Sequence, residues 1–221
     1  MATSYRSGVS FVVVIPIKTL ANAKRRLRRQ FSAADTEELA FAFASDTLAA
    51  ALACTGVREI MVISADARVG RMANSHGVRL IPDPGGGLNA AIRGGIAAAR
   101  ADSCVAVAVL AADLPALTAG HLGAALAAAS GIERAVVADR SGTGTTLLTA
   151  SAGISLIPAF GRGSRLRHGG LGHRALAIDC GSPLRLDVDT PDDLSAAQQL
   201  GVGPATSAHL RLIAARPHRT P

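Results

Sequence analysis

Three aspartates lie beside apolar residues, where a charged side chain suggests a specific role. Asp113 follows the apolar run 105–112, and Asp187 and Asp189 alternate with apolar residues near the other end of the chain. The alternation predicts a strand with both carboxylates on one face, where like charges repel unless a cation lies between them. Mg²⁺ is bound through one or two carboxylates together with phosphate oxygens. The aspartates therefore predict a metal–phosphate site, although Asp113 taken alone could equally bond to the next helix or loop.

Positive charge is densest in two segments, residues 18–29 and 162–174. Lysine offers a phosphate group a point charge, and arginine offers it a planar fork of donors. Lys18 directly follows the first predicted strand, 11–15, where a triphosphate would be wrapped, so we expect a functional role for it. For any single arginine of the same segment, a solvated helix face is the simpler interpretation.

A glycine-rich segment comes before an alanine-rich helix in the middle of the chain. Gly85–Gly87 open that helix, and glycine there allows close approach of the backbone N–H groups to a ligand. The segment is neither a P-loop nor a G-x-G-x-x-G fingerprint, so a flexible loop is the simpler interpretation of Gly86 and Gly87 alone. Asn89 is a candidate base or ribose contact, or a polar residue early in the helix.

Two later segments add hydroxyl groups and cations. Segment 142–145, Gly-Thr-Gly-Thr, can surround a small anion, although glycine turns beside threonine-rich strands are common. Segment 160–168 contains two glycines, one serine and three arginines. His168 and His173 lie in this glycine-rich basic region, and we interpret both as loop residues without a metal role.

The remaining elements must position these groups. The run 105–110 is apolar on both faces, which predicts a central strand of a parallel sheet covered by helices on each side. In open α/β sheets, ligands bind outside the carboxyl ends of the strands, so Asp113 is expected at that rim. Further strands are expected at 11–15, 60–64, 78–81, 134–139 and after 144, and helices at 35–53, 66–75 and 118–129.

A chain of 221 residues is expected to form one domain with a core that needs no disulfides. We expect a flexible N-terminus at 1–10, the domain itself at 11–203, and a C-terminal tail at 204–221 that is irregular and partly mobile. Three prolines in that last segment favour the irregular tail.

Composition restricts the function classes. The net charge of +7 indicates an anionic partner, but one Tyr and no Trp provide few platforms for single-stranded nucleic acid. No apolar run approaches the ~20 residues of a membrane span, and no signal-peptide core precedes the first strand. The three cysteines are odd in number, lack metal-ligand spacing and look like buried thiols of a reducing compartment. We therefore expect a cytoplasmic protein that binds neither nucleic acid nor membrane.

Taken together and in order, five segments resemble one family, the guanylyltransferases of deazaflavin coenzyme F-420 biosynthesis, which join GTP to 2-phospholactate or phosphoenolpyruvate. The resemblance extends from about Val12 to Thr206. It implies a nucleotidyltransferase fold akin to the GT-A glycosyltransferases: one α/β, Rossmann-like domain with a mixed central sheet flanked by helices. The segments are Pro16-Ile17-Lys18, Ala23-Lys24-Arg25-Arg26-Leu27, Ala112-Asp113-Leu114-Pro115, Gly142-Thr143-Gly144-Thr145 and Asp187-Val188-Asp189-Thr190-Pro191.

The resemblance also implies roles for individual residues. Three aspartates match metal ligands, which we expect to hold two Mg²⁺ ions; they are Asp113, Asp187 and Asp189. Three residues match the phosphoenolpyruvate pocket, namely Thr145, Gly161 and Ser164. The triphosphate is expected to be held by Lys18, Lys24 and Arg26. Independently of the resemblance, the glycine-rich helix start leads us to expect the nucleotide against Gly86, Gly87 and Asn89.

The expected reaction transfers GMP from GTP to phosphoenolpyruvate, with release of pyrophosphate. The acceptor phosphate is itself the nucleophile, so no Ser-His-Asp arrangement is required, and positioning with charge neutralisation supplies the rate. Phosphoenolpyruvate is favoured over 2-phospho-L-lactate only because the alanine- and arginine-rich composition resembles that of high-GC bacteria, whose members are linked to it. A downstream transferase of the same pathway is a candidate partner.

Other functions stay open at this point. The acceptor could be 3-phosphoglycerate. A nucleotidyltransferase acting on molybdopterin is the nearest rival, but such enzymes usually carry a glycine-rich first loop where this chain has Pro16-Ile17-Lys18. A basic nucleic-acid-binding module belongs to a different class, and its affinity would fall steeply with salt concentration.

Overall fold

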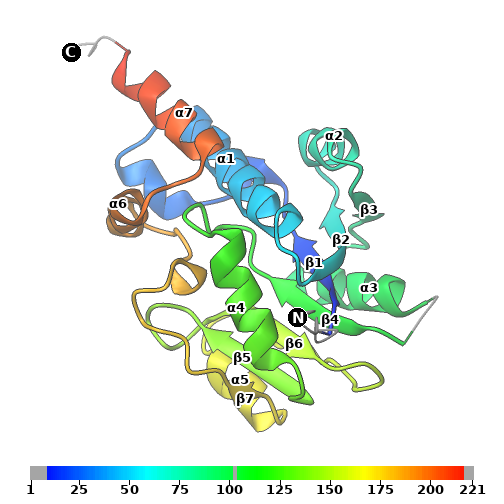
Figure 1. The fold of residues 1–221 in the computed structure, drawn as a ribbon. Coiled ribbons are helices and arrows are strands. Elements are labelled where there is room, and N and C mark those ends of the chain that lie inside the picture. The colour runs from blue at the N-terminus through cyan, green and yellow to red at the C-terminus, as the bar shows by residue number, and fades with distance from the viewer. Residues whose placement is uncertain (1–8, 102–103, 217–221) are drawn as a thin grey trace, which may run out of the picture.

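The computed structural model describes residues 9–101 and 104–216. Within them, seven strands form one sheet in the order β3-β2-β1-β4-β6-β5-β7 (Figure 1). β6 is antiparallel to β4 and β5, and the other neighbouring pairs are parallel. The expected α/β domain with a mixed sheet is therefore confirmed. The strands are β1 Phe11–Pro16, β2 Val57–Ser64, β3 Arg79–Pro82, β4 Ala106–Leu110, β5 Arg134–Ala138, β6 Thr145–Ala150 and β7 Arg174–Ala175.

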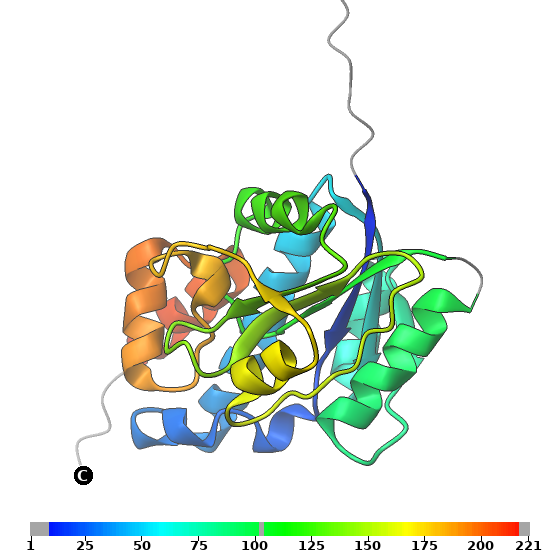
Figure 2. The ribbon, with the colours of Figure 1, turned by 90° about the horizontal axis from the view of Figure 1, so that it is seen from below.

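The helices cover both faces of this sheet. In β1, Val13 and Ile15 pack in one buried cluster with residues of α1 and α4, whereas Val12 and Val14 pack in another with residues of α3. Figure 2 shows α3 and α4 on opposite sides of the sheet. This is why β1 and β4 are apolar at every position rather than at alternate ones. The helices are α1 Ala33–Leu52, α2 Ala67–Ser75, α3 Leu88–Arg100, α4 Ala119–Ala129, α5 Ser164–Gly170, α6 Pro191–Leu200 and α7 Pro204–Ala214, with 3₁₀ turns η1 Leu20–Asn22, η2 Arg25–Arg29 and η3 Pro183–Arg185.

The C-terminal segment is a packed helix and not an irregular tail, so that prediction is wrong for residues 204–214. Pro204 stands in the first turn of α7, where its missing N–H costs nothing. The carboxylate of Asp46, on α1, accepts hydrogen bonds from the N–H groups of Ala205 and Thr206, both at 2.9 Å. α7 therefore lies along α1 (Figure 1). Residues 1–8 and 217–221, for which flexibility was expected, lie outside the described part of the chain.

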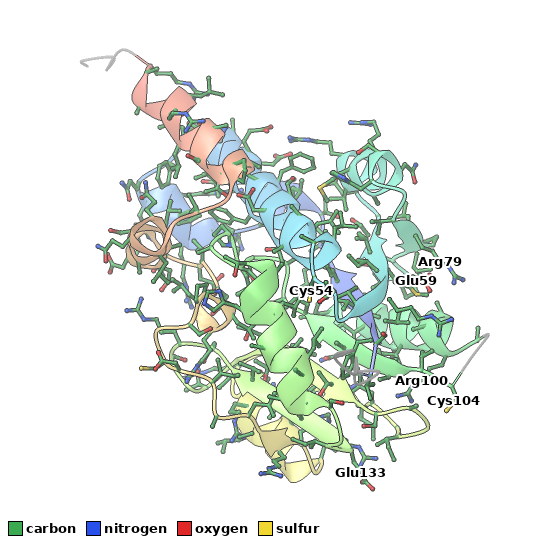
Figure 3. The ribbon with its side chains drawn as sticks, viewed as in Figure 1. Cys54, Glu59, Arg79, Arg100, Cys104 and Glu133 are labelled. Carbon is green, nitrogen blue, oxygen red and sulfur yellow. The ribbon has the colours of Figure 1, made fainter. Side chains whose placement is uncertain are left out.

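Two smaller expectations are also corrected. Cys54 is buried, but Cys104 and Cys180 are exposed, so the thiols are not all buried (Figure 3 labels Cys54 and Cys104). Residues 186–190 follow η3 as irregular chain and not as a strand. Among the described residues, no helix is both long and apolar enough to span a bilayer.

Candidate active site

The segment that carries Asp187 and Asp189 is fixed against the end of β4. The N–H of Val188 donates to the backbone carbonyl of Asp113 at 3.0 Å. Val188 is fully buried in a cluster with Leu27 and Leu39. This apolar anchor holds the segment in place without a strand ladder, while the flanking aspartates stay partly accessible.

The turn after β4 is supported by α1. Thr47 donates to the carbonyl of Phe43 at 2.8 Å, as buried helical threonines often do, and its hydroxyl oxygen accepts the N–H of Leu114 at 3.0 Å. The same hydroxyl proton is shared with the carbonyl of Ala112, whose oxygen lies 3.3 Å from Oγ1 of Thr47. Asp113 lies between these two anchored neighbours, so its backbone is fixed from both sides.

Lys24 connects the two acidic segments. Its ammonium group donates to the carboxylate of Asp113 and to Oδ1 of Asp189, the latter at 2.7 Å. The Lys24 side chain is only 11% exposed, against 28% for Asp113 and 50% for Asp189. Lys24 itself has a left-handed backbone with φ of 52°, which a residue other than glycine rarely adopts. Such local strain is typical of functional sites, where the surrounding structure enforces it.

The charges of this cluster shift one another's pKa values. Burial raises the pKa of Asp187, the neighbouring charges of Asp113 and Asp189 raise it further, and it reaches about 7. Burial also raises the pKa of Asp189, but Lys24 and Arg26 outweigh this and lower it below its usual value. For Lys24, burial lowers the pKa, yet the two carboxylates raise it above the ordinary value. Three carboxyl groups around one ammonium group therefore leave a site that favours additional positive charge.

The carboxylates of Asp113, Asp187 and Asp189 suit a hard cation, although in the structure two of them bind the ammonium group of Lys24. Carboxylate oxygens are the ligands that Mg²⁺ prefers. However, within residues 9–101 and 104–216, no group of three or more Asp, Glu, His or Cys side chains stands in metal-binding geometry. Lys24 takes the place between Asp113 and Asp189 that a cation would occupy. Magnesium binding by the three aspartates stays a prediction, and it requires the Lys24 ammonium group to move away from Asp113 and Asp189.

A cavity of about 330 Å³ opens at the carboxyl ends of the first three strands. Its lining combines apolar side chains with Lys18, Asp83 and the backbone of Gly87. Gly87 is the N-cap of α3 with φ of 89°, a conformation that favours glycine. The complete lining is Pro16, Ile17, Lys18, Thr19, Ile63, Asp83, Gly87, Leu88 and Ala91.

Asp83 lines this cavity but was not among the residues predicted from the sequence. Its Oδ1 accepts the N–H of Gly85 at 2.9 Å, which leaves Oδ2 for another donor. The available signal was its position directly after β3, which is similar to that of Asp113 shortly after the end of β4. Of the basic residues expected at the triphosphate, Lys18 is exposed at this cavity, and Arg26 is exposed on η2 close enough to influence Asp189.

Asn89 does not have a free amide group. Its Oδ1 accepts the N–H of Phe160 at 2.8 Å, and its Nδ2 donates to the carbonyl of the same residue at 3.1 Å. The side chain therefore joins the first turn of α3 to the loop before α5. It pairs with both the N–H and the carbonyl of Phe160, as the backbone of a neighbouring strand does in a sheet. The expected contact between Asn89 and a nucleotide stays a prediction, but the observed bonds give Asn89 a structural role.

Thr145 and Ser164 meet at the other side of Asp113. Thr145 begins β6, which pairs with β4 so that Leu147 lies opposite Leu110. The Ser164 hydroxyl, at the start of α5, donates to Oγ1 of Thr145 at 3.1 Å. Gly161 has φ of 117°, and its carbonyl accepts the N–H of Ser164 at 3.0 Å. The three residues expected at the acceptor pocket thus belong to one connected group.

The interpretation of His168 as a loop residue is wrong, whereas His173 does lie in the loop between α5 and β7. His168 lies on α5 and is fully buried, and His173 is 4% exposed. Their rings pack at 5.6 Å between centroids. Basic and glycine-rich neighbours in the sequence suggested a loop, but His168 lies on α5 and points to the inside of the fold beside Thr145.

The sheet order arranges these features along one edge. β4 lies between β1 and β6, so the cavity beyond β1 and the Thr145–Ser164 group at β6 lie on opposite sides of Asp113. β6 is antiparallel to β4, and its first residue therefore reaches the edge at which β4 ends. An anionic substrate on each side would bring two phosphate groups toward the Lys24–aspartate cluster.

Comparison with known proteins gives a consistent result. The family model described as "Guanylyl transferase CofC like" matches residues 11–220. A phosphoenolpyruvate guanylyltransferase of Thermomonospora curvata is 46% identical over 208 residues, which cover 93% of this chain and 91% of that protein. A phosphoenolpyruvate guanylyltransferase of Streptomyces scabiei is 48% identical over 206 residues, covering 90% of this chain and 95% of that protein.

Solved structures show the same fold at low sequence identity. A 4-diphosphocytidyl-2C-methyl-D-erythritol synthase is similar with a TM-score of 0.60 at 16% identity, covering 87% of this chain and 99% of that one. A cytidylyltransferase from Leptospira borgpetersenii has a TM-score of 0.55 at 13% identity, with 93% of both chains covered. These similarities concern the fold alone.

Proposed function

This chain belongs to the CofC-like guanylyl transferase family, and we propose that it transfers GMP from GTP to phosphoenolpyruvate in the biosynthesis of coenzyme F-420. The observation that supports the proposal is the placement of the cavity beyond β1 and the Thr145–Ser164 group on either side of the Lys24–aspartate cluster at one sheet edge. A nucleotidyl transfer needs this arrangement, because it joins two phosphorylated molecules through a single phosphorus atom.

The reaction is a displacement at the α-phosphorus of GTP. An oxygen of the acceptor phosphate forms the new bond, and the bond from the α-phosphorus to the bridging oxygen of the β-phosphate breaks. Enolpyruvoyl-2-diphospho-5′-guanosine forms, and pyrophosphate leaves. The attacking phosphate is already anionic near neutral pH, so the protein must align the reactants and offset their charge rather than remove a proton.

The basic residues of the first loop are proposed to bind the triphosphate. Lys18 is exposed at the cavity, and Arg26 lies on the exposed side of η2. Lys24 is proposed to turn from the aspartates to the leaving pyrophosphate when substrates bind. Magnesium bound by Asp113, Asp187 and Asp189 would neutralise phosphate charge and hold the two reactants in line.

The cavity beyond β1 is proposed to receive the guanine base. Apolar side chains such as Leu88 and Ala91 offer it a flat surface, and Asp83 offers a carboxylate. Guanine presents two donors on one edge, N1–H and the N2 amino group, which a carboxylate accepts. Adenine lacks the N1–H donor, so Asp83 would favour GTP over ATP.

The Thr145–Ser164 group is proposed to bind the acceptor acid. A hydroxyl donor such as that of Thr145, in a buried, water-poor setting, binds a carboxylate or phosphate more strongly than it would in water. The relatives named for phosphoenolpyruvate support that acceptor, while 2-phospho-L-lactate and 3-phosphoglycerate have the same two anionic groups. The cytoplasm is the proposed compartment, and a transferase that consumes the activated diphosphate is the proposed downstream partner.

The decisive experiment is a pyrophosphate-release assay on the purified chain. It crosses GTP, ATP, CTP and UTP with phosphoenolpyruvate, 2-phospho-L-lactate and 3-phosphoglycerate, with and without Mg²⁺. The proposal expects release only with GTP, with phosphoenolpyruvate as the best acceptor, and none after chelation. Release that needs no acid, or that prefers another nucleotide, would contradict it.

A further inference from the structure

The hydrogen bonds around His168 determine which of its ring nitrogens carries the proton. The backbone N–H of Ala159 donates to Nε2 at 2.9 Å. An amide N–H can only donate, so Nε2 must be the unprotonated nitrogen of a neutral ring. The proton therefore lies on Nδ1, which stands 3.0 Å from Oγ1 of Thr145.

This tautomer decides what the Thr145 hydroxyl can do. Oγ1 of Thr145 accepts the Nδ1–H of His168 and the hydroxyl proton of Ser164, the latter at 3.1 Å. Both lone pairs of Oγ1 are then in use, and its own proton must point elsewhere. Among the hydrogen bonds of residues 9–101 and 104–216, none uses that proton.

His168 is held rigidly enough for this orientation to persist. Its side chain is fully buried, and its ring meets that of Phe160 edge to face at 4.9 Å between centroids. Burial lowers the pKa of His168, the nearby His173, Arg167 and Arg165 lower it further, and it falls to about 4. The ring is thus neutral near pH 7, with its single proton directed at Thr145.

We propose that His168 is a positioning residue: by donating to Thr145, it forces the Thr145 hydroxyl to act as a donor toward an anionic group of the acceptor acid. The inference rests on the proposed function and adds the group that sets the polarity of the acceptor site. Without the Nδ1–H donor, the Thr145 hydroxyl could donate back into the protein and offer the anion a lone pair instead. The acceptor would then meet repulsion in place of a hydrogen bond.

Two matched substitutions separate the two bonds of His168. In His168→Asn, the amide nitrogen takes the place of Nδ1 and can still donate to Thr145, but nothing accepts the N–H of Ala159. In His168→Gln, the amide oxygen takes the place of Nε2 and still accepts from Ala159, but the donor to Thr145 is lost. A purely structural role predicts that both variants behave alike.

The experiment measures KM and kcat for phosphoenolpyruvate and for GTP, together with the melting temperature. His168→Gln is expected to raise KM for phosphoenolpyruvate about tenfold or more, the effect of losing one charge-assisted hydrogen bond, with KM for GTP and the melting temperature near those of the parent protein. His168→Asn is expected to keep KM for phosphoenolpyruvate within about threefold while it lowers the melting temperature. Thr145→Val combined with His168→Gln should be no worse than Thr145→Val alone, because both remove the same donor.

Each result decides the matter. An unchanged KM for phosphoenolpyruvate in His168→Gln overturns the inference, and so does an equal rise of both KM values in both variants. Isothermal titration calorimetry of phosphoenolpyruvate with each variant, in the presence of MgCl₂, gives the same comparison without turnover. If the parent protein transfers GMP to none of the acids, the proposed function itself fails, which is a different outcome from an active parent with an insensitive His168→Gln.

Discussion

The ammonium group of Lys24 donates to Oδ1 of Asp189 across 2.7 Å, although 165 positions separate the two residues in the chain. The same group also pairs with Asp113 at the end of β4. One side chain of the first loop thus holds together two acidic segments from the middle and the end of the sequence. Phosphate groups and a divalent cation would compete for the partners of this ion-pair cluster, so we expect substrate binding and the release of Lys24 to be coupled.

Removal of either carboxylate partner of Lys24 is expected to abolish most turnover. Asp113→Asn and Asp189→Asn should each lower kcat by about 10³-fold or more, because aligned charge neutralisation supplies several kcal/mol of the barrier reduction. Pyrophosphate release at saturating Mg²⁺ measures this. Asp192→Asn, an exposed carboxylate in the first turn of α6, is the matched control and should retain turnover within about twofold. Near-normal turnover in either site variant would remove the aspartates from the reaction.

Loss of the Lys24 ammonium should be compensated by metal. Lys24→Gln leaves three neighbouring carboxyl groups without their internal cation, so the melting temperature should fall in the absence of Mg²⁺ and recover when it is added. In the parent protein, the same addition should raise the melting temperature less, because Mg²⁺ must displace Lys24. Arg25→Gln removes one exposed positive charge from the same segment and should show the response of the parent. Equal magnesium responses in all three proteins would argue against a shared site for Lys24 and the metal.

Asp83 is expected to read the nucleotide base. Asp83→Asn keeps the acceptor for the N–H of Gly85 but replaces one carboxylate oxygen with a donor. KM for GTP should rise about tenfold to a hundredfold, the range for one charge-assisted hydrogen bond, while KM for phosphoenolpyruvate stays the same. Steady-state kinetics with GTP, ITP and ATP measure the discrimination. A GTP preference that survives the substitution would place base recognition elsewhere.

The paired hydrogen bonds between Asn89 and Phe160 are expected to support both substrate regions. Asn89→Ala leaves the N–H and the carbonyl of Phe160 without partners, which should lower the free energy of unfolding by about 1–3 kcal/mol. Because Phe160 adjoins the loop that leads to Ser164, KM for phosphoenolpyruvate should also rise. Urea unfolding and kinetics test the two effects together. A rise in KM for GTP alone, with stability unchanged, would instead favour a direct nucleotide contact.

The free energy of unfolding should fall in acid because His168 is buried in its neutral form. Its pKa is about 4 in the folded protein against 6.5 for an ordinary histidine, so the unfolded chain binds the proton more readily. The neutral His168 ring makes its full contribution to the free energy of unfolding above about pH 6.5. This contribution is lost as the pH falls toward 4, at about 1 kcal/mol per pH unit. Burial lowers the pKa of His173 as well, which adds in the same direction. His168→Gln should show a shallower decline in urea unfolding between pH 6.5 and 4.5, and a slope equal to that of the parent would contradict the buried neutral ring.

Local sequence patterns predicted the elements better than they predicted the surroundings of single residues. The valine-rich runs of β1 and β4 predicted buried strands because a strand covered on both faces has no polar side. The prolines after position 203 suggested an irregular tail, but Pro204 begins a helix that Asp46 caps from α1. Asp46 is 159 positions from Ala205, whose N–H it accepts, and no local sequence pattern indicates that contact. His168 was misplaced for the same reason, because its partners Thr145 and Ala159 lie outside its own helix.

The sequence by itself determined the α/β class, the three candidate aspartates and the family to which the chain belongs. Strand periodicity and short motifs are local properties of the chain, so they can be recognised without a structure. The tertiary structure alone decided that Lys24 lies between Asp113 and Asp189, that the amide of Asn89 is already paired, and that His168 directs its proton at Thr145. These relationships depend on the order of strands and the packing of loops. Hydrogen-bond partners and charge neighbours are set by distances in space, and separation along the chain does not encode them.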